Sequence, residues 1–548
     1  MTQEPTRATG SRADAHVLAV DLGTGGPKVA VLTAAGHLVS HAFEPVGMTL
    51  LPDGGAEQDP DGWWRAVVVA ARRALADAGV APEQVVGVGC TAQWSGTVAV
   101  DGSGRAIGPA VSWMDSRGSG AVRRQVRGRV NVLGYDAAHV ARWIRRSGGI
   151  PSLSGKDPVG HILFLKEQRP EVYREASVFL EPVDYLNLRL TGLARASYDT
   201  ITLHWVTDNR RIDRVAYSPS LLAMAGLDRR TLPDLVPTAT VLGGLAAGAA
   251  EELGLVPGTA VVTGTGDLHS AAVGSGAVED FAGHLYIGTS SWISCHVPFK
   301  KTSAVNNITS IPSGIPGRYL VADEHETGGA CLTWLRDRVL YPSGAGAPEA
   351  APPDALDRMN AVAAGVPAGS NGVLFTPWLN GERSPVDDHT IRAGFHNMSL
   401  STTRDDMVRA VFEGVALNSR WLLGAVEKFV GRTFPSLAFI GGGAGSDLWS
   451  QIHADATGRT VRQMADPVLA NVRGAGFLTL LALGRLEVAD IPSKVAVRAE
   501  YHPDPDAAPV YEALAGEFVA LYKQTKGIHR RLNRTVRTAR STGPAPNR

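Results

Sequence analysis

Cysteine is scarce in this chain, and neither sign of charge predominates. The three cysteines, Cys90, Cys295 and Cys331, lie far apart in 548 residues, and none belongs to a C-x-x-C pair. A sparse, odd set in a long chain argues against a disulfide framework and favours a reducing compartment. Basic and acidic residues both number 53, so the formal net charge is zero. A balanced charge provides no general attraction to nucleic acid or to an anionic membrane.

Long apolar stretches are also missing. No uninterrupted apolar run reaches the roughly 18 residues that a membrane span requires. The polar first 15 residues lack the apolar centre of a signal peptide. Apolar residues make up 44% and charged residues 19%, with 62 glycines and 33 prolines, which is typical of a globular protein rich in turns. Because 548 residues are too many for one ordinary hydrophobic core, we expect two domains. Because the cysteines are sparse and long apolar segments are missing, we expect a cytoplasmic protein.

Most standard signatures of nucleotide and metal sites are absent too. The segment SLSGKD (152–157) is similar to a Walker A loop, but five residues separate Gly149 from Gly155 where that motif has four, and Asp157 replaces its Ser or Thr. No G-x-G-x-x-G follows a strand, and H-E-x-x-H, cysteine–histidine clusters and G-x-S-x-G are missing. These absences argue against a dinucleotide site, a structural zinc site and a serine-hydrolase site.

What the sequence does contain is an alternation of apolar strands and helices. Strands are predicted at 16–23, twice within 28–44, and at 85–92, and strand-then-glycine segments recur at 260–267, 284–294 and 437–446. Asp59-Pro60 opens a helix whose buried face carries Trp63, Val67, Ala70 and Ala71, and Thr402 and Thr403 cap a long helix over 404–429. This order indicates an α/β fold with mixed sheets.

The repetition of strand-then-glycine segments in the second half indicates a second domain, and composition indicates the two tails. We place a domain boundary near 275–282, which gives domains at 16–278 and 279–526 and tails at 1–15 and 527–548. The second tail is basic. It is interpreted as a solvated tail, and a nucleic-acid-binding arm is the less favoured alternative.

Four glycine turns follow apolar strands, at 21–26, 264–267, 288–291 and 441–446. Such turns leave backbone N–H groups open to an anion and suit phosphate binding, although each alone is also an ordinary tight turn. Two of them carry an acid, Asp21 and Asp267. Phosphoryl transfer requires one carboxylate that positions Mg²⁺ and one that accepts a hydroxyl proton. The alternative is that both acids merely cap their turns.

An ordered set of motifs over about residues 16–525 resembles the FGGY family of carbohydrate kinases, within the actin, Hsp70 and hexokinase superfamily. EQDPDGWW (57–64) is similar to a segment of its xylulokinase branch. The other similar segments are DLGTGGPKVAVL (21–32), SWMDSR (112–117), PVDYLNLRLTG (182–192), GTGDLHSAAVGSG (264–276), IGTSSW (287–292), ETGGACLTWLRD (326–337), LNGERSP (379–385), GFHNMSLSTTRDDMVRAVFEGVA (394–416) and IGGGAGSDLW (440–449). The resemblance implies an α/β protein of two RNase-H-like (actin/hexokinase-type) domains, with ATP and sugar in the cleft between them.

The resemblance also implies roles for individual residues. Asp267 is the catalytic base, and Asp21 holds Mg²⁺ through water. The implied ATP-binding residues are Thr24, Lys28, Gly288, Thr289, Gly329, Thr333, Gly442, Gly443 and Ser446. The implied substrate-binding residues are Gln93, Trp94, Ser95, Trp113 and Asp267. Trp292 is a further candidate wall of the sugar site. The alternatives are that Trp113 and Trp292 are core aromatics and that Lys28 lies at a solvated strand end.

The sugar side departs from the family. Gln93-Trp94-Ser95 stands where its pentulose kinases have Gln-Met-His, and Leu268 stands where they have Asn after the catalytic acid. Because unpaired buried polar groups are costly, the loss of two polar partners predicts a different pattern of substrate hydroxyls. The family's N-terminal signature is degraded as well, with His161 and Phe164 at positions of Lys and Trp.

We therefore expect an ATP-dependent kinase acting on a small sugar or polyol, with a ketopentose such as xylulose as the first candidate. Its expected cofactors are ATP and Mg²⁺, with no nucleic-acid or membrane partner, and family habit suggests a homodimer. The alternative is a non-kinase of the same superfamily, either an ATP-driven clamp or a sugar-responsive regulator, because fold alone does not fix function. The retained Asp267 and the sugar-side segment at 92–96 favour the kinase.

Overall fold

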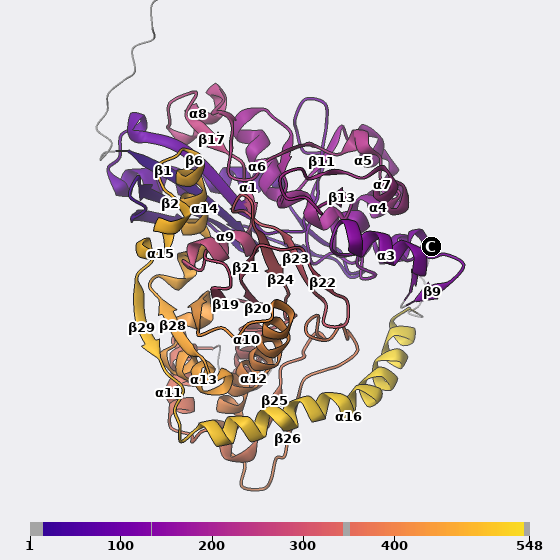
Figure 1. Cartoon of the computed structure of the whole chain (residues 1–548), viewed down its shortest axis with the longest axis vertical. Helices are drawn as coiled ribbons and strands as arrows, with labels where there is room; N and C mark the ends of the chain where they lie inside the picture. Colours follow the sequence, from indigo (N-terminus) through magenta and orange to yellow (C-terminus); the bar gives the residue numbers. More distant parts are fainter. Residues whose placement is uncertain (1–14, 133, 343–350, 542–548) are drawn as a thin grey trace, which may run out of the picture.

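Two large mixed sheets organise the protein, and helices and several smaller sheets of two to four strands pack around them (Figure 1). The computed structural model describes residues 15–132, 134–342 and 351–541. The N-terminal sheet has the order β16-β17-β6-β1-β2-β3, with β18 also paired to β6. Its strands are β1 His16–Gly23, β2 Gly26–Thr33, β3 Leu38–Phe43, β6 Val85–Ala92, β16 Val241–Gly244, β17 Ala260–Val262 and β18 Thr265–Gly266. The predicted α/β architecture is confirmed.

The C-terminal sheet repeats part of this pattern. Its order is β20-β19-β27-β28-β29. The strands are β19 Gly283–Ile287, β20 Ser291–Ser294, β27 Ser436–Ile440, β28 Thr460–Met464 and β29 Val497–Tyr501. In both sheets a hairpin (β1–β2, β19–β20) is followed by a parallel neighbour of its first strand (β6, β27). The glycine turns of the two hairpins therefore hold equivalent places.

Capping residues mark the first residues of the two helices that the sequence predicted. Asp59 caps α1 by accepting from the Asp61 N–H, and Thr403 and Asp406 form a capping box at α12. The helices are α1 Pro60–Ala78, α2 Ser119–Gln125, α3 Ala137–Arg146, α4 Pro158–Gln168, α5 Pro170–Glu175, α6 Pro182–Thr191, α7 Pro219–Ala225, α8 Ala247–Leu253, α9 Asp267–Gly274, α10 Ala330–Leu335, α11 Ala355–Ala364, α12 Arg404–Val430, α13 Asp447–Thr457, α14 Ala470–Ala482, α15 Ile491–Lys494 and α16 Ala508–Ser541. Within the described ranges, no helix combines the length and the apolar character needed to cross a membrane.

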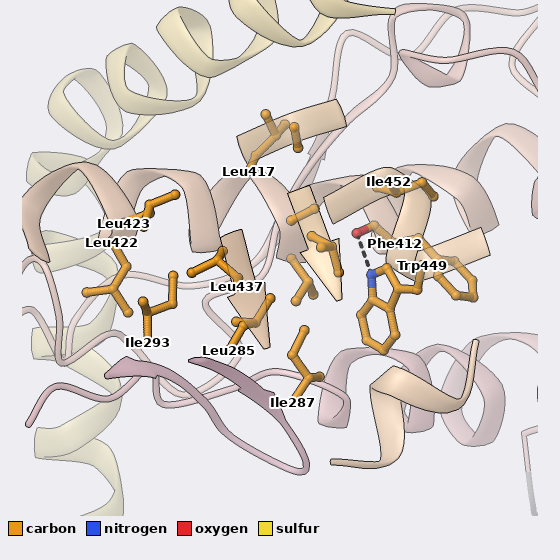
Figure 2. Close-up of a cluster of buried hydrophobic side chains, with 14 of the residues drawn as sticks. Leu285, Ile287, Ile293, Phe412, Leu417, Leu422, Leu423, Leu437, Trp449 and Ile452 are labelled. Atoms are coloured by element: carbon orange, nitrogen blue, oxygen red, sulfur yellow. Dashed lines mark hydrogen bonds between the residues drawn. The ribbon is translucent and has the colours of Figure 1, made fainter. Parts of the chain in front are cut away.

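The C-terminal core holds strand β19 in place. Figure 2 shows Leu285 and Ile287 of β19 packed with Leu437 of β27 and with leucines of α12. Trp449 donates a hydrogen bond from Nε1 to the Phe412 carbonyl at 3.0 Å, which satisfies its one polar group in this cluster. Burying each such side chain stabilises the folded state by about 1.5–3 kcal/mol. This packing therefore fixes the position of β19, which leads to the turn at residues 288–291.

Helix α14 crosses the boundary expected between the domains. It follows the C-terminal sheet in sequence, yet it packs against β1, β2, β6 and α9 (Figure 1). The α9 and α14 backbones meet at two glycines. A Cβ on Gly274 would lie 1.8 Å from the Ala470 carbonyl oxygen, and one on Gly474 would lie 1.9 Å from the Ser270 carbonyl oxygen. The segment 279–526 thus contributes a helix to the N-terminal sheet.

The segment from residue 527, expected to be a flexible tail, is instead helical as far as Ser541, so that expectation is wrong for residues 527–541. Helix α16 runs from Ala508 to Ser541 along the outer side of the C-terminal unit (yellow in Figure 1). Tyr511 and Phe518 are buried, and the Asn533 side-chain amide donates to the Thr390 carbonyl at 2.6 Å. Arginine is a good helix former, so a basic composition did not require disorder. Residues 1–14 and 542–548, also expected as tails, lie outside the described residues.

Candidate active site

The two acids meet at one edge of the N-terminal sheet. Asp21 of β1 and Thr265 of β18 both pair with Thr91 of β6, and β1 and β18 run parallel to β6 on either side of it. Asp267 follows two residues after Thr265, as the first residue of α9 rather than the last of a strand. The carboxyl ends of parallel strands are a usual place for ligand sites in α/β sheets.

Burial governs the ionisation of both carboxyl groups. The pKa of Asp21 is raised by burial, and the nearby Lys28 ammonium, with Nζ 3.5 Å from Oδ2, partly opposes this. The other oxygen of Asp21, Oδ1, is buried without a hydrogen-bond partner among the described residues. Burial raises the pKa of Asp267 to about 7, and the negative charges of Asp21 and Glu324 add to the effect. A carboxyl that titrates near neutral pH is suited to accepting a proton.

A metal ion here would need ligands from outside the chain. Over the described ranges, no group of three or more His, Cys, Asp or Glu side chains is arranged to hold a metal ion. The unpaired Oδ1 of Asp21 nevertheless offers one oxygen ligand. This fits Mg²⁺, which commonly takes one or two carboxylates and completes its shell with water and substrate phosphates.

Three of the predicted residues share one hydrogen-bond network. Thr24 Oγ1 donates to Gln93 Oε1 at 3.0 Å and accepts from Trp113 Nε1 at 3.1 Å. Gln93 Nε2 donates to Gln58 Oε1 at 2.7 Å, and Gln58 Nε2 donates to the Thr24 carbonyl at 2.9 Å. Thr24, expected to bind ATP, is therefore joined by hydrogen bonds to Gln93 and Trp113, which are expected to bind substrate. Gln58 was missed, although it lies in the EQDPDGWW segment that carried the resemblance.

The loop at 94–96, which the sequence predicts to bind substrate, has an unusual backbone. Ser95 has a φ of 68°, and its Oγ donates to the Lys156 carbonyl at 2.9 Å. The next residue, Gly96, donates its N–H to the buried carboxylate of Glu181 at 3.0 Å. Trp94 packs edge-on against His269, with ring centroids 4.8 Å apart. A non-glycine residue with positive φ is strained and persists only where its surroundings fix it, as these contacts do.

Lys156 links this loop to the C-terminal unit. Its Nζ lies 3.3 Å from Oε1 of Glu326, and Arg383 forms ion pairs with Glu324 and Glu326. Neighbouring carboxylates raise the pKa of the Arg383 guanidinium against the opposing effect of burial. The SLSGKD segment therefore supplies a bridge between the units. It lies outside the pocket described next.

A pocket of about 990 Å³ lies beside the second hairpin. Thr24 and Lys28 lie outside it. A Cβ on Gly443 would lie 2.8 Å from Ile287 Cγ2, whereas one on Gly442 would meet open space. The predicted residues that line it are Gly288, Thr289, Gly329, Thr333, Gly442, Gly443 and Ser446. The pocket is also lined by Trp334, Asp337 and Trp449, which lie within the segments 326–337 and 440–449 that carried the resemblance, and by Arg338, Tyr341 and Asn360, which had no sequence signal.

Trp292 is a core aromatic, which is one of the two alternatives left by the sequence. It is 6% exposed, and its ring stacks on Tyr286 at 3.9 Å between centroids with 7° between the planes. Its Nε1 donates to His284 Nε2 at 3.2 Å. The contact with Trp292 aligns the ring of Tyr286, a residue without a site signal in the sequence.

Comparisons with known proteins agree with this architecture. The model of the FGGY family of carbohydrate kinases matches residues 16–274 with its N-terminal domain and residues 284–483 with its C-terminal domain. A xylulose kinase of Staphylococcus epidermidis is 27% identical over 517 residues, covering 93% of this chain and 97% of that protein. An autoinducer-2 kinase of Klebsiella pneumoniae is 27% identical over 531 residues, covering 94% of each.

Solved structures of carbohydrate kinases have a similar fold. The ligand-bound xylulose kinase from Lactobacillus acidophilus superposes with a TM-score of 0.82 at 20% identity, covering 94% of this chain and 100% of that one. The predicted two-domain fold of the actin/hexokinase type is confirmed.

Proposed function

Because this chain belongs to the FGGY family of carbohydrate kinases and is therefore a phosphotransferase that uses ATP, we propose that Asp267 is its catalytic base. The acceptor is a hydroxyl of a small sugar or polyol. The observation that carries the proposal is the Asp267 carboxyl, which stands at the sheet edge next to Asp21 with a pKa of about 7. Near neutral pH it is available to accept a proton and also able to release it.

In the proposed step, the N-terminal unit supplies the two acids and the C-terminal unit supplies the nucleotide contacts. The substrate oxygen attacks the γ-phosphorus, its proton passes to the Asp267 carboxylate, and ADP leaves. Mg²⁺, when bound, neutralises charge on the phosphates, and Asp21 is the residue that would hold it. The glycine turns at 288–291 and 441–446, which line the 990 Å³ pocket, are the proposed nucleotide contacts. Their backbone N–H groups suit phosphate oxygens.

The substrate proposed first is a ketopentose such as xylulose. Relatives named for xylulose and for autoinducer-2 align over nearly the whole chain at the same identity, so both substrates belong in a test panel. On the sugar side, Gln93 and Ser95 already bond to other protein groups, and Leu268 offers no polar side chain. The acceptor proposed here therefore has fewer polar contacts at this loop than the family's pentulose kinases provide. A cytoplasmic homodimer is proposed on the sparse cysteines and on family habit.

A coupled assay of ADP release over a panel of sugars and polyols tests the proposal. We expect release that depends on one class of acceptor and that Asp267→Ala abolishes. Asp213→Asn, which alters an exposed acid paired with Arg211, is the control and should leave turnover unchanged. Substantial turnover by Asp267→Ala would refute the role of the base. Hydrolysis of ATP that is independent of every acceptor would favour a clamp-like protein of the same superfamily.

A further inference from the structure

Tyr286 lies on strand β19, two residues before Gly288, which lines the nucleotide pocket, and the charges of Asp267 and Asp21 act on its phenol. It pairs with Trp292 across the hairpin and with Ile440 of β27. Its neighbours Leu285 and Ile287 face the C-terminal core in Figure 2, so the alternation of a strand directs Tyr286 to the opposite face. That face packs with residues of β1, α9 and α14, the elements around the site.

The ring of Tyr286 is held in one orientation. It stacks on the buried Trp292 with 7° between the planes, and Trp292 is in turn fixed by its hydrogen bond to His284. The hydroxyl points toward the turn that lines the pocket, because a Cβ on Gly288 would lie 2.6 Å from the Tyr286 oxygen. Glycine at 288 therefore leaves room for the phenol.

The hydroxyl is free to bind a ligand. Tyr286 is only partly buried, and over the described ranges its oxygen has no hydrogen-bond partner. Burial raises the pKa of the phenol, and the negative charges of Asp267 and Asp21 raise it further. The group therefore stays protonated at neutral pH and remains a hydrogen-bond donor, and the two carboxylates that influence it are those of the proposed site.

We propose that Tyr286 is a catalytic residue whose hydroxyl donates a hydrogen bond to an oxygen of the γ-phosphoryl group during transfer. This inference rests on the proposed function. In the step, the bond from the substrate oxygen to the γ-phosphorus forms, the bond from that phosphorus to the bridging oxygen of ADP breaks, and the hydroxyl proton passes to Asp267. Tyr286 keeps its own proton throughout.

The physical reason is the placement of a fixed donor where charge is spread in the transition state. During transfer, negative charge is distributed over the three equatorial oxygens of the phosphoryl group. A preoriented donor stabilises that charge without reorganising. A neutral donor also forms no ion pair with Asp267 and does not compete with Lys28 for Asp21, whereas a lysine or arginine at position 286 would do both.

Tyr286→Phe tests the proposal because it removes the hydroxyl and keeps the stacked ring. We expect kcat to fall about 10- to 100-fold, while the Kd for ADP, measured by calorimetry, changes by less than about twofold. Sulfur accepts hydrogen bonds weakly, so the ratio of rates with ATP and ATPγS should also decrease in the variant. Tyr173→Phe is the matched control, since Tyr173 also stacks on an aromatic ring, that of Phe179, but lies in the outer helical cluster of the N-terminal unit.

The outcomes separate this inference from the function on which it rests. A wild-type kcat in Tyr286→Phe would overturn the inference and leave acceptor-dependent transfer by the wild type intact. A loss of ADP affinity as large as the loss of rate would also overturn it, because the hydroxyl would then act in ground-state binding. Absence of acceptor-dependent transfer from the wild type itself would overturn both proposals.

Discussion

Replacing Asp267 by asparagine should stabilise the folded protein at alkaline pH while it removes the proposed base. The pKa of this carboxyl is raised from 3.8 to about 7 by burial and by the charges of Asp21 and Glu324. Between these two pKa values the folded state binds more protons than the unfolded state, so stability falls as pH rises through this window. The destabilisation is small below about pH 4 and complete above about pH 7.

The size of the effect follows from the same values. At about 1.4 kcal/mol for each pKa unit, ionised Asp267 destabilises the fold by up to about 4 kcal/mol. The side chain is partly exposed and accepts a hydrogen bond from the Leu268 N–H at 2.9 Å, so we expect about half of this, roughly 2 kcal/mol. Asparagine is nearly isosteric and keeps the oxygen that accepts from Leu268, so the change isolates the charge.

Urea unfolding followed by tryptophan fluorescence measures the effect at about pH 5 and about pH 8. The advantage of Asp267→Asn over the wild type should grow between these two values, while acceptor-dependent ADP release falls by about a thousandfold or more. Asp213→Asn should show no such growth. An advantage that is equal at both pH values, or that shrinks as pH rises, would refute the raised pKa and with it the electrostatic account of the site.

Three further changes test other parts of the site. Glu324→Gln removes one charge that raises the pKa of Asp267, so the rise of kcat/KM with pH, expected near pH 7, should move to lower pH. An unchanged pH profile would contradict the effect of the Glu324 charge on Asp267. Lys156→Met breaks the contact with Glu326 and should raise KM for the sugar while the Kd for ADP stays constant; a parallel rise in both would argue against a sugar-side role. Gly443→Ala places a Cβ 2.8 Å from Ile287 Cγ2 and should weaken ADP binding about tenfold by calorimetry, unlike Gly424→Ala, whose Cβ meets open space.

The parts of the fold that the sequence predicted are those with local causes. The predicted bounds agree with the structure for strands β1 and β6 and for the start of helix α12. Apolar runs and capping residues determine such bounds within a few positions of the chain. The glycine turns were found for the same reason, since glycine permits backbone geometry that other residues resist. Most of the predicted ATP-side residues consequently lie together around one pocket.

The parts that were missed depend on contacts between distant segments. Gln58 joins the site through Gln93, and Lys156 reaches Glu326 across the two units. The orientation of Tyr286 depends on its pairing with Trp292 and on which face of β19 is the core. Helix α14 could not be placed on the N-terminal sheet from its sequence, because its small residues are equally compatible with packing in either unit.

The contact between Gly274 and Gly474 has a mechanical consequence. Two backbones in direct contact leave no side chain to compress, so this crossing would be the fulcrum of any rotation of α9 against α14. Asp267 lies seven residues along α9 from Gly274, a lever arm of about 10 Å at 1.5 Å per residue. Each degree of rotation about the crossing would move the base by about 0.2 Å, so a turn of a few degrees could bring its oxygen into or out of reach of a substrate hydroxyl.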